Sequence, residues 1–331
     1  MMTLPPSEIK KIAVFRALQL GDMLCAIPAI KALRHAYPDA DIVLIGLPWA
    51  KSLTERFNNY FDGFIKFAGY PGLPEQPFEP AAFTEFLSLV QKEKFDLAIQ
   101  MQGNGSVINP MMELFGAKYV AGYAKDGHYA PDNGLFMHYP DYGHEIDRHL
   151  LLMEYLGVPS QGSELEFPLT TADYNSLDEL KLGLEPKNYV CIHPGSRGAW
   201  RQWPVQYFAS LADYCVEQGF KAVITGTKDE APIIDDVIKH MRYDPINTAG
   251  KTSMGGVGAL IQNAAMLISN CTGVSHIASA FKTPSIVISM DGEPQRWGPL
   301  DTRVHRTINW LQSPDFHSVF RETVELVSLA G

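Results

Sequence analysis

The stretch AAMLISNCTGVSHIASAFKTPSIVI, residues 264–288, decides the fold of this chain. Its pattern predicts a short apolar strand, a Thr-Gly turn, a helix that begins near 274–276, and a second apolar strand that follows Pro284. Two such strands joined through a helix form a right-handed crossover, in which the strands are parallel. The segment therefore predicts an α/β fold with a parallel sheet covered by helices.

The turn inside this stretch has the features of an anion-binding site. The first amides of a helix have no partner within the helix and lie at the positive end of its dipole, so a phosphate group fits there. Gly273 lets the backbone approach a bulky anion, and Thr272 and Ser275 add hydroxyl donors. His276 stands one turn into the helix, on the side that faces the loop. We interpret this turn as a phosphate-binding site.

The alternation of apolar strands and amphipathic helices extends in both directions from this stretch. It begins with a strand at 11–16 and restarts with a strand at 189–193. Between these halves, residues 158–187 are polar and contain three prolines, which indicates an interdomain boundary. A chain of 331 residues accommodates two domains of ordinary size.

We therefore expect an N-terminal domain over residues 1–165 and a C-terminal domain over residues 186–312. The remaining residues, 313–331, predict a terminal helix with Ser313 as its N-cap. Polar loops in both halves suggest a cleft with a nucleotide on one wall and an acceptor on the other.

Charge and composition argue against several classes of protein. The net charge of −10 disfavours a nucleic-acid-binding protein that neutralises phosphates, and it gives no general attraction to an anionic membrane. No apolar run reaches the roughly 18 residues of a spanning helix. The N-terminal residues lack the apolar core of a signal peptide. The four cysteines have no CxxC pairing, which is typical of reduced thiols in a cytoplasmic protein.

The first polar loop contains Asp22, which falls where the first strand turns into the first helix. This is the carboxyl end of a strand, where open α/β sheets bind ligands. Asp22 has two interpretations. It is either a helix N-cap or a general base that takes a proton from an acceptor hydroxyl at the edge of a cleft. The glycine fingerprint of a dinucleotide site is absent from this loop.

The second polar loop, VCIHPGSRGAWRQWP at 190–204, follows the first strand of the second half. Arg197 and Arg201 lie in this loop, and Ser196 supplies a hydroxyl. Guanidinium groups bind phosphate oxygens in a bidentate manner and stay charged, so the loop is a candidate phosphate site. The alternative is a solvated basic loop without a ligand.

Two further loops have weaker signals. Glu230 follows the next strand and either accepts hydrogen bonds from a ribose or serves as a helix-start carboxylate. The GKT within 249–260 lacks the upstream glycine of a P-loop, so it is not a Walker site. No group of His, Cys or carboxylate residues has convincing metal spacing, and we expect no metal.

Taken in order, these segments resemble glycosyltransferase family 9, the lipopolysaccharide heptosyltransferase family. The resemblance covers roughly residues 11–310. The segments that carry it are the LGD motif followed by an apolar helix and YPDADI, then IQMQGNGSVINPMMELFGAKYVAGY (99–123), HEIDRHLLLMEYLG (144–157), the Gly-Ser…Trp-Pro loop, the Gly…Glu loop, AGKTS and TGVSH. Each segment alone is a modest signal, but the ordered set is specific.

The resemblance implies a GT-B fold, in which two Rossmann-like domains face each other across a cleft and the last helix returns to the first domain. It implies inverting transfer of a sugar, with heptose as a candidate, from a nucleotide-diphospho-sugar, with ADP favoured as the nucleotide. The acceptor would be a cell-surface glycan or a lipid-linked precursor, reached by a cytoplasmic enzyme with peripheral contact to the inner membrane. The nucleotide sugar is a substrate, and no cofactor or metal is implied.

The resemblance also assigns roles to residues. Asp22 matches the general base, and Arg201 falls where the family has a lysine that steadies the diphosphate. Cys271 stands where the family commonly has an aspartate, and a thiol cannot accept hydrogen bonds from sugar hydroxyls as a carboxylate does. The remaining donor contacts are Ser196, Thr272, Gly273 and His276 for the phosphates or sugar, Glu230 for the ribose, and Thr252 and Ser253 near the base. Arg197 would join Arg201 in stabilising the leaving diphosphate.

Two other functions are compatible with the sequence. One is a family member that binds a nucleotide sugar, or a partner, without turnover. The other is a different two-domain α/β enzyme on a nucleotide, such as a sugar-nucleotide epimerase or a dehydrogenase; the missing glycine fingerprint counts against the dehydrogenase.

Overall fold

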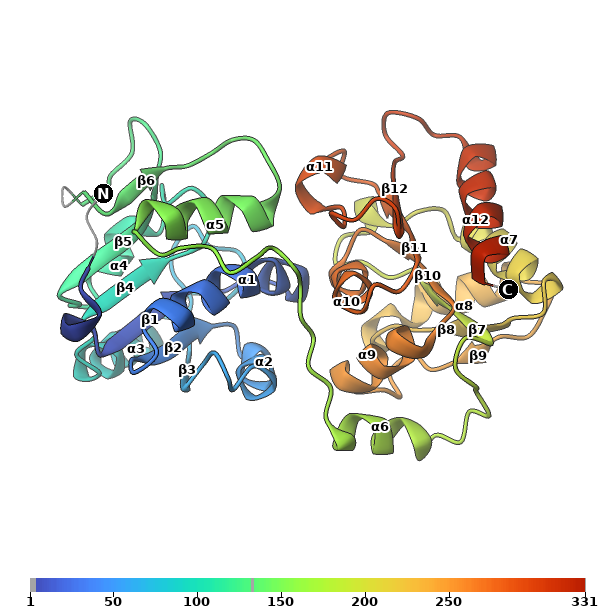
Figure 1. Cartoon of the computed structure of the whole chain (residues 1–331), viewed down its shortest axis with the longest axis horizontal. Coiled ribbons are helices and arrows are strands. Elements are labelled where there is room, and N and C mark those ends of the chain that lie inside the picture. The colour runs from blue at the N-terminus through green and yellow to red at the C-terminus, as the bar shows by residue number, and fades with distance from the viewer. Residues whose placement is uncertain (1–3, 132–133, 331) are drawn as a thin grey trace. The chain divides into compact units, whose positions relative to one another are not determined.

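The structure is a computed structural model that describes residues 4–131 and 134–330. The chain divides into two compact units, Met1–Glu164 and Leu165–Gly331, which we call the N-terminal and C-terminal domains. The division falls inside the polar stretch 158–187. Each domain has a six-stranded sheet with helices on both faces (Figure 1).

The N-terminal domain is built on parallel strands that are buried on both sides. In β2 every residue from Ile42 to Gly46 is buried, as expected for a strand covered by helices on both faces. The elements of this domain are 3₁₀ helix η1 (Pro6–Glu8), strands β1 (Lys11–Phe15), β2 (Asp41–Gly46), β3 (Gly63–Lys66), β4 (Leu97–Gln100), β5 (Tyr119–Ala124) and β6 (Phe136–His138), and helices α1 (Leu20–Ala36), α2 (Ala50–Arg56), α3 (Pro80–Lys92), α4 (Asn109–Glu113) and α5 (Glu145–Tyr155).

Helix α1 is more completely buried than its sequence pattern predicts. We expected a single apolar face, but nearly every residue from Met23 to Leu33 is buried. The reason is that α1 packs along α5 while it covers the sheet, so two of its sides are occupied (Figure 1). On the other face of the sheet, side chains of α3 and α4 pack with Ala13 and Phe15 of β1.

The C-terminal domain repeats this architecture without repeating the sequence. Its elements are strands β7 (Tyr189–His193), β8 (Lys221–Ile224), β9 (Ile246–Asn247), β10 (Met266–Asn270), β11 (Ser285–Ser289) and β12 (His305–Asn309), 3₁₀ helices η2 (Ala199–Arg201) and η3 (Lys228–Glu230), and helices α6 (Thr171–Asp178), α7 (Val205–Glu217), α8 (Ala231–His240), α9 (Met254–Asn263), α10 (Gly273–Phe281), α11 (Pro294–Trp297) and α12 (Phe316–Ala330). Apolar side chains of α7, α8 and α12 form one core with the sheet.

The strand order is the same in both domains. It is β3-β2-β1-β4-β5-β6 in the first sheet and, read from the other edge, β9-β8-β7-β10-β11-β12 in the second. In both sheets, neighbouring strands among the described residues run parallel. This is the Rossmann order, in which the chain direction across the sheet reverses between the first and fourth strands.

The position of the last helix corrects one expectation. We expected residues 313–331 to return to the N-terminal domain, but α12 packs against α7, β10 and β11 (Figure 1). Val319, Leu326 and Val327 belong to the hydrophobic core of the C-terminal domain. The helix also begins at Phe316, later than expected, because the carboxylate of Asp315 accepts the amides of the first turn.

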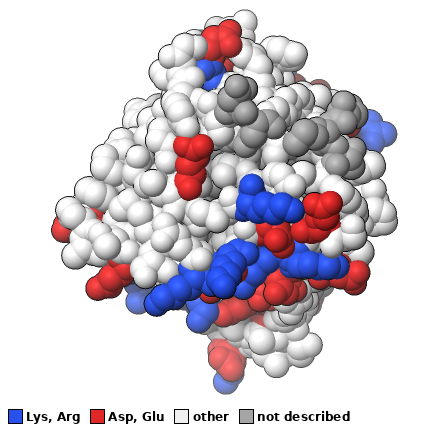
Figure 2. Space-filling model, turned by 90° about the vertical axis from the view of Figure 1, so that its left-hand side faces the viewer, with Lys and Arg blue, Asp and Glu red and all other residues white. Residues whose placement is uncertain are grey.

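The charged surface of the molecule is mixed in sign. Figure 2 shows one face on which Lys and Arg side chains form a band with Asp and Glu side chains beside them. Ion pairs of this kind join Lys118 to Glu8 at 3.1 Å and Lys11 to Glu93 in the N-terminal domain. Among the helices that the structure describes, none has the length and apolar character needed to cross a membrane.

Candidate active site

The strand order places most of the candidate residues at the reversal point of each sheet. In open α/β sheets, ligands bind outside the carboxyl ends of the strands at this point. In the C-terminal domain the point lies between β7 and β10, which pair directly. The loop that follows β7 carries Ser196, Arg197 and Arg201, and the turn after β10 carries residues 271–276. Asp22 follows β1 in α1, at the corresponding edge of the first sheet.

The loop after β7 is fixed by a side chain that sequence reasoning missed. Asn270, the last residue of β10, is fully buried. Its Nδ2 donates to the carbonyl oxygens of Pro194 at 2.7 Å and Gly195 at 3.3 Å, and its Oδ1 accepts the Trp203 amide at 3.0 Å. Both ends of the loop are thereby tied to β10. A polar residue that ends an apolar strand is the signal that could have indicated this role.

The two arginines of this loop have different environments. Arg197 is exposed, which agrees with the solvated-loop interpretation for this residue. Arg201 is half-buried, forms an ion pair with Asp291, and its guanidinium lies 5.2 Å from the centre of the Trp200 ring. Ser196 is buried, and its carbonyl oxygen accepts Gln202 Nε2 at 3.0 Å. The loop therefore presents one restrained cation and one solvated cation.

Asp291 is the second residue that sequence reasoning missed. It lies in the loop after β11, and its side chain is only 5% exposed. Burial alone would raise the pKa of this carboxyl, but hydrogen bonds from Ser289, the Glu293 amide and Arg201 outweigh burial and lower the pKa. Asp291 is therefore ionised at neutral pH. Its signal in the sequence is a carboxylate directly beyond an apolar strand, at the edge where sites form.

The turn from β10 into α10 has the expected geometry, with one difference. Thr272 is the N-cap residue of α10, has extended backbone, and makes no side-chain cap bond, so the first amides of α10 are not capped by its hydroxyl. Gly273 begins the helix, and His276 is buried in its first turn. The difference concerns Ser275, whose hydroxyl donates to the Thr272 carbonyl at 2.7 Å instead of pointing at a ligand.

Cys271, the residue before this turn, is a neutral thiol. Burial, together with the nearby charge of Asp291, raises its pKa to about 12, although Arg201 acts in the opposite direction. Its Sγ donates to the Trp297 carbonyl at 3.6 Å. Cys271 therefore lies beside the Arg201–Asp291 pair and carries no charge of its own.

Glu230 lies at the start of a helical segment, η3, as one of its two interpretations expected. Its Oε2 accepts the Thr227 amide at 2.8 Å and the Thr227 hydroxyl at 3.0 Å, which forms a capping box for η3. Glu230 also touches the loop after β7, because a Cβ built on Gly195 would lie 2.1 Å from Glu230 Oε1. The carboxylate thus joins the loops that follow β7 and β8.

Thr252 and Ser253 lie at the start of α9, one loop further along the sheet edge. Ser253 Oγ accepts the Gly256 amide at 3.0 Å as the N-cap of α9. The Thr252 hydroxyl is buried and, within the described part of the chain, has no hydrogen-bond partner. The Gly250 amide donates to the Gly226 carbonyl at 2.8 Å, which ties this loop to the loop after β8.

In the N-terminal domain, Asp22 occupies the third position of α1. Its Oδ2 accepts the Gln19 amide at 3.2 Å, so Asp22 closes a capping box at the start of α1, in which Gln19, and not Asp22 as one interpretation expected, is the N-cap. The residue is half-buried. A carboxylate has two oxygens and about four acceptor sites, so the bond to the Gln19 amide is compatible with a role as a base.

A buried arginine fixes the backbone at Asp22. Arg16 is 1% exposed, and its Nε donates to the Asp22 carbonyl at 2.9 Å. The other end of its guanidinium donates to the Met101 carbonyl and, at 3.3 Å, to Glu145 Oε1. Arg16 therefore joins the loops after β1 and β4 to the first turn of α5. His149 lies 3.4 Å from the same Glu145 oxygen.

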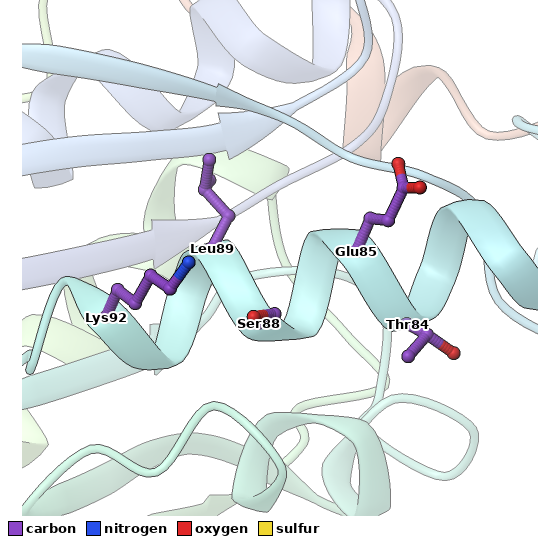
Figure 3. Close-up of a pocket in the computed structure, with 5 residues that line it drawn as sticks. All are labelled: Thr84, Glu85, Ser88, Leu89 and Lys92. Atoms are coloured by element: carbon purple, nitrogen blue, oxygen red, sulfur yellow. The ribbon is translucent and has the colours of Figure 1, made fainter.

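Neither a group of metal ligands nor the hollow on α3 adds to the candidate site in the described residues. Across residues 4–131 and 134–330, no three His, Cys, Asp or Glu side chains are grouped so that they could hold a metal ion. A hollow on α3 is lined by Thr84, Glu85, Ser88, Leu89 and Lys92, which all come from this one helix (Figure 3). None of the candidate residues lies in this hollow.

The chain is similar to known proteins over most of its length. The sequence profile of glycosyltransferase family 9 (heptosyltransferase) matches residues 84–324. Lipopolysaccharide heptosyltransferase 3 of Escherichia coli strain K12 is 27% identical over 325 residues, which cover 91% of this chain and 89% of that protein.

Solved structures show the same fold. A family 9 glycosyltransferase from Veillonella parvula superposes with a TM-score of 0.80 at 19% identity, covering 98% of both chains. E. coli ADP-heptose lipopolysaccharide heptosyltransferase II gives a TM-score of 0.73 at 16% identity, covering 97% of this chain and 99% of that one. The expected α/β, GT-B fold class is confirmed. With the profile match over most of the chain, these findings show that the chain belongs to glycosyltransferase family 9 and is a glycosyltransferase.

Proposed function

We propose that this glycosyltransferase moves heptose from ADP-heptose to a lipopolysaccharide-type acceptor, with inversion and without a metal. The names of its relatives support the donor and the acceptor class. The observation that carries the proposal lies in the C-terminal domain: the uncapped start of α10 and the restrained cation Arg201 follow neighbouring strands at one sheet edge.

The donor half of the site would stabilise the leaving group. Departure of ADP places negative charge on the β-phosphate oxygens. Preorganised donors aimed at such charge are an effective form of catalysis. The Gly273 and Val274 amides at the start of α10 and the guanidinium of Arg201 would supply them, with the Thr272 hydroxyl beside them, while the Ser275 amide already donates to the Thr272 carbonyl at 2.9 Å. Arg197 would add a solvated cation. Glu230 would accept hydrogen bonds from the ribose through its remaining oxygen.

Asp22 would act as the general base. The acceptor hydroxyl oxygen attacks the anomeric carbon, and the bond from that carbon to the diphosphate oxygen breaks. The hydroxyl proton goes to the Asp22 carboxylate, and ADP leaves with the bonding electrons. A single displacement of this kind inverts the configuration at the anomeric carbon. Arg16 would keep the backbone at Asp22 in place through its bond to the Asp22 carbonyl.

The enzyme would work in the cytoplasm, on an acceptor anchored in the inner membrane. The lipopolysaccharide-type acceptor implies this site of action. The charged band of Figure 2 is mixed in sign, so the contact would be local and weak and would not depend on a general attraction to anionic lipid.

Replacement of Asp22 by Asn tests the proposal. Asn retains an oxygen that accepts the Gln19 amide, so α1 keeps its cap. We expect kcat for transfer from ADP-heptose to fall by about 10²- to 10⁴-fold, the usual contribution of a general base, with ADP affinity unchanged. Asp39→Asn changes an exposed aspartate of the same domain and serves as the control.

The possible outcomes separate the hypotheses. If the wild type binds ADP-heptose but does not transfer it, the chain is a binding member of the family without turnover. If neither ADP nor ADP-heptose binds, the proposed donor is wrong. If Asp22→Asn transfers heptose as fast as the wild type, Asp22 is only a helix cap.

A further inference from the structure

The Arg201–Asp291 ion pair spans the end of a strand. Arg201 belongs to the loop after β7, and Asp291 to the loop after β11. These two strands are not neighbours, because β10 lies between them in the order β11-β10-β7. A side-chain contact between the two loops therefore bridges the strands on either side of β10, at the end of the sheet where α10 begins.

In this pair the carboxylate is the fixed partner. Asp291 Oδ1 accepts the Ser289 hydroxyl at 2.7 Å and the Glu293 amide at 3.2 Å. Its Oδ2 accepts Arg201 Nη2. The Asp291 side chain is 5% exposed, whereas the Arg201 side chain is 33% exposed. The three bonds hold the carboxylate in one orientation, and the arginine extends toward it from a loop that is more open.

Arg201 has donors to spare after this contact is made. A guanidinium carries five N–H groups in a rigid fork, and the ion pair uses Nη2. The indole of Trp200 lies against the guanidinium at 5.2 Å. The pKa of the adjacent Cys271 thiol responds to both members of the pair, so their charges lie beside the residue that precedes the N-cap of α10. Arg201 Nε is buried, so the N–H groups of Nη1 are the ones available next to the start of α10.

We infer that Asp291 is a positioning residue, which holds the guanidinium of Arg201 over the start of α10 before the donor binds. This inference rests on the proposed function and adds a residue to it. A long arginine side chain loses considerable rotamer freedom when it is fixed. Because the contact with Asp291 forms when the chain folds, Arg201 is already ordered before the donor binds. Its charge is then in place when the diphosphate leaves.

Asp291→Asn tests this role while it spares the loop. The side-chain oxygen of Asn still accepts the Ser289 hydroxyl and the Glu293 amide, but its NH₂ group cannot pair with a guanidinium. We expect kcat to fall by about 10- to 100-fold, the loss that follows when a reacting charge shifts by about 1 Å. ADP affinity should change by less than about threefold, because the interaction concerned acts mainly in the transition state.

A double-mutant cycle separates positioning from a structural role. In an Arg201→Met background, Asp291→Asn should have little further effect on kcat, because the group that it positions is gone. A structural role would produce the same loss in both backgrounds, together with a lower melting temperature. Asp301→Asn, which breaks the exposed 3.0 Å ion pair with Arg303 in the same domain, is the matched control and should leave kcat unchanged.

A second measurement does not depend on turnover. Arg201 Nε is buried, so its N–H proton should exchange slowly with water in the wild type. In Asp291→Asn we expect this ¹⁵N–¹H resonance to broaden or exchange faster. An unchanged resonance, or a kcat equal to that of the wild type, would overturn the role of Asp291. A wild type that neither transfers heptose nor binds ADP would overturn the proposed function, while the resonance would still decide whether Asp291 holds Arg201.

Discussion

Gly195 has no side chain, and this allows the loop after β7 to lie in contact with Glu230 in the loop after β8. A Cβ at this position would lie 2.1 Å from Glu230 Oε1 and 2.2 Å from Glu230 Cδ. Real Cβ atoms do not approach other atoms so closely, so a side chain at residue 195 would have to displace the Glu230 carboxylate. The glycine therefore lets the loop after β7 lie against Glu230 while Glu230 keeps its bonds with Thr227.

Gly195→Ala should therefore lower both stability and ADP affinity. The added methyl group displaces Glu230 and breaks its bonds with Thr227, at a cost of about 1–3 kcal/mol in unfolding free energy, as for other overpacked sites. Urea unfolding and calorimetry with ADP measure the two effects. In a Glu230→Ala background the same substitution should cost little, and an equal loss there would contradict this explanation. Gly198→Ala is a milder control, because its Cβ would meet only the exposed Trp200 side chain.

At the scale of elements, strand ends are connected by polar side chains as well as by the sheet. Asn270 at the end of β10 bonds to both ends of the loop after β7, and Asp291 after β11 bonds to Arg201 in that same loop. Three strand ends are thereby coupled around the start of α10. A loop held in this way presents donors in fixed positions, which is what stabilisation of a leaving group requires.

Helix α12 provides a test of packing at the same scale. Leu326 is 3% exposed in the core of the C-terminal domain, whereas Leu329, one turn later, is 78% exposed. Leu326→Ala should lower the unfolding free energy by about 2–5 kcal/mol, the usual cost of a truncated core leucine. Leu329→Ala should change it by no more than about 0.5 kcal/mol. Similar denaturation midpoints for the two variants would show that α12 does not stabilise this domain.

Local patterns predicted the elements and the loops that carry the candidate residues. The strand-turn-helix pattern was sufficient to place Ser196, Arg201 and Thr272 in loops beyond strand ends, because each lies in a polar segment that follows an apolar run. The Arg201–Asp291 contact was not predictable in this way, since it depends on which strands are neighbours. The position of α12 was missed for a related reason: periodicity identifies an apolar face but does not name the surface that it covers.

At the scale of the whole molecule, each domain has its own sheet and its own hydrophobic core. The candidate donor residues all come from the C-terminal domain, and α12 completes that domain's core. Asp22 and the Arg16 network come from the N-terminal domain. The proposed function thus places donor binding and proton removal in different domains.

Residues 165–331 should therefore fold and bind ADP when produced alone. We expect a single cooperative unfolding transition and a rise in melting temperature when ADP is added, because a ligand that binds only the folded state stabilises it. Differential scanning fluorimetry with and without ADP measures both. The fragment that stops at residue 312 lacks α12 and is the control, which should unfold at a lower temperature. A non-cooperative transition in the longer fragment would refute independent folding.

The burial of all four cysteines has a practical consequence for spectroscopy. Burial raises the pKa of Cys191, Cys215 and Cys271 to about 12, so these thiols remain protonated and react slowly with maleimides at neutral pH. A cysteine introduced at an exposed position on each domain would accept a fluorophore without prior removal of the native thiols. Energy transfer between two such dyes would then test whether the distance between the labelled positions changes when ADP is added, in an otherwise unaltered enzyme.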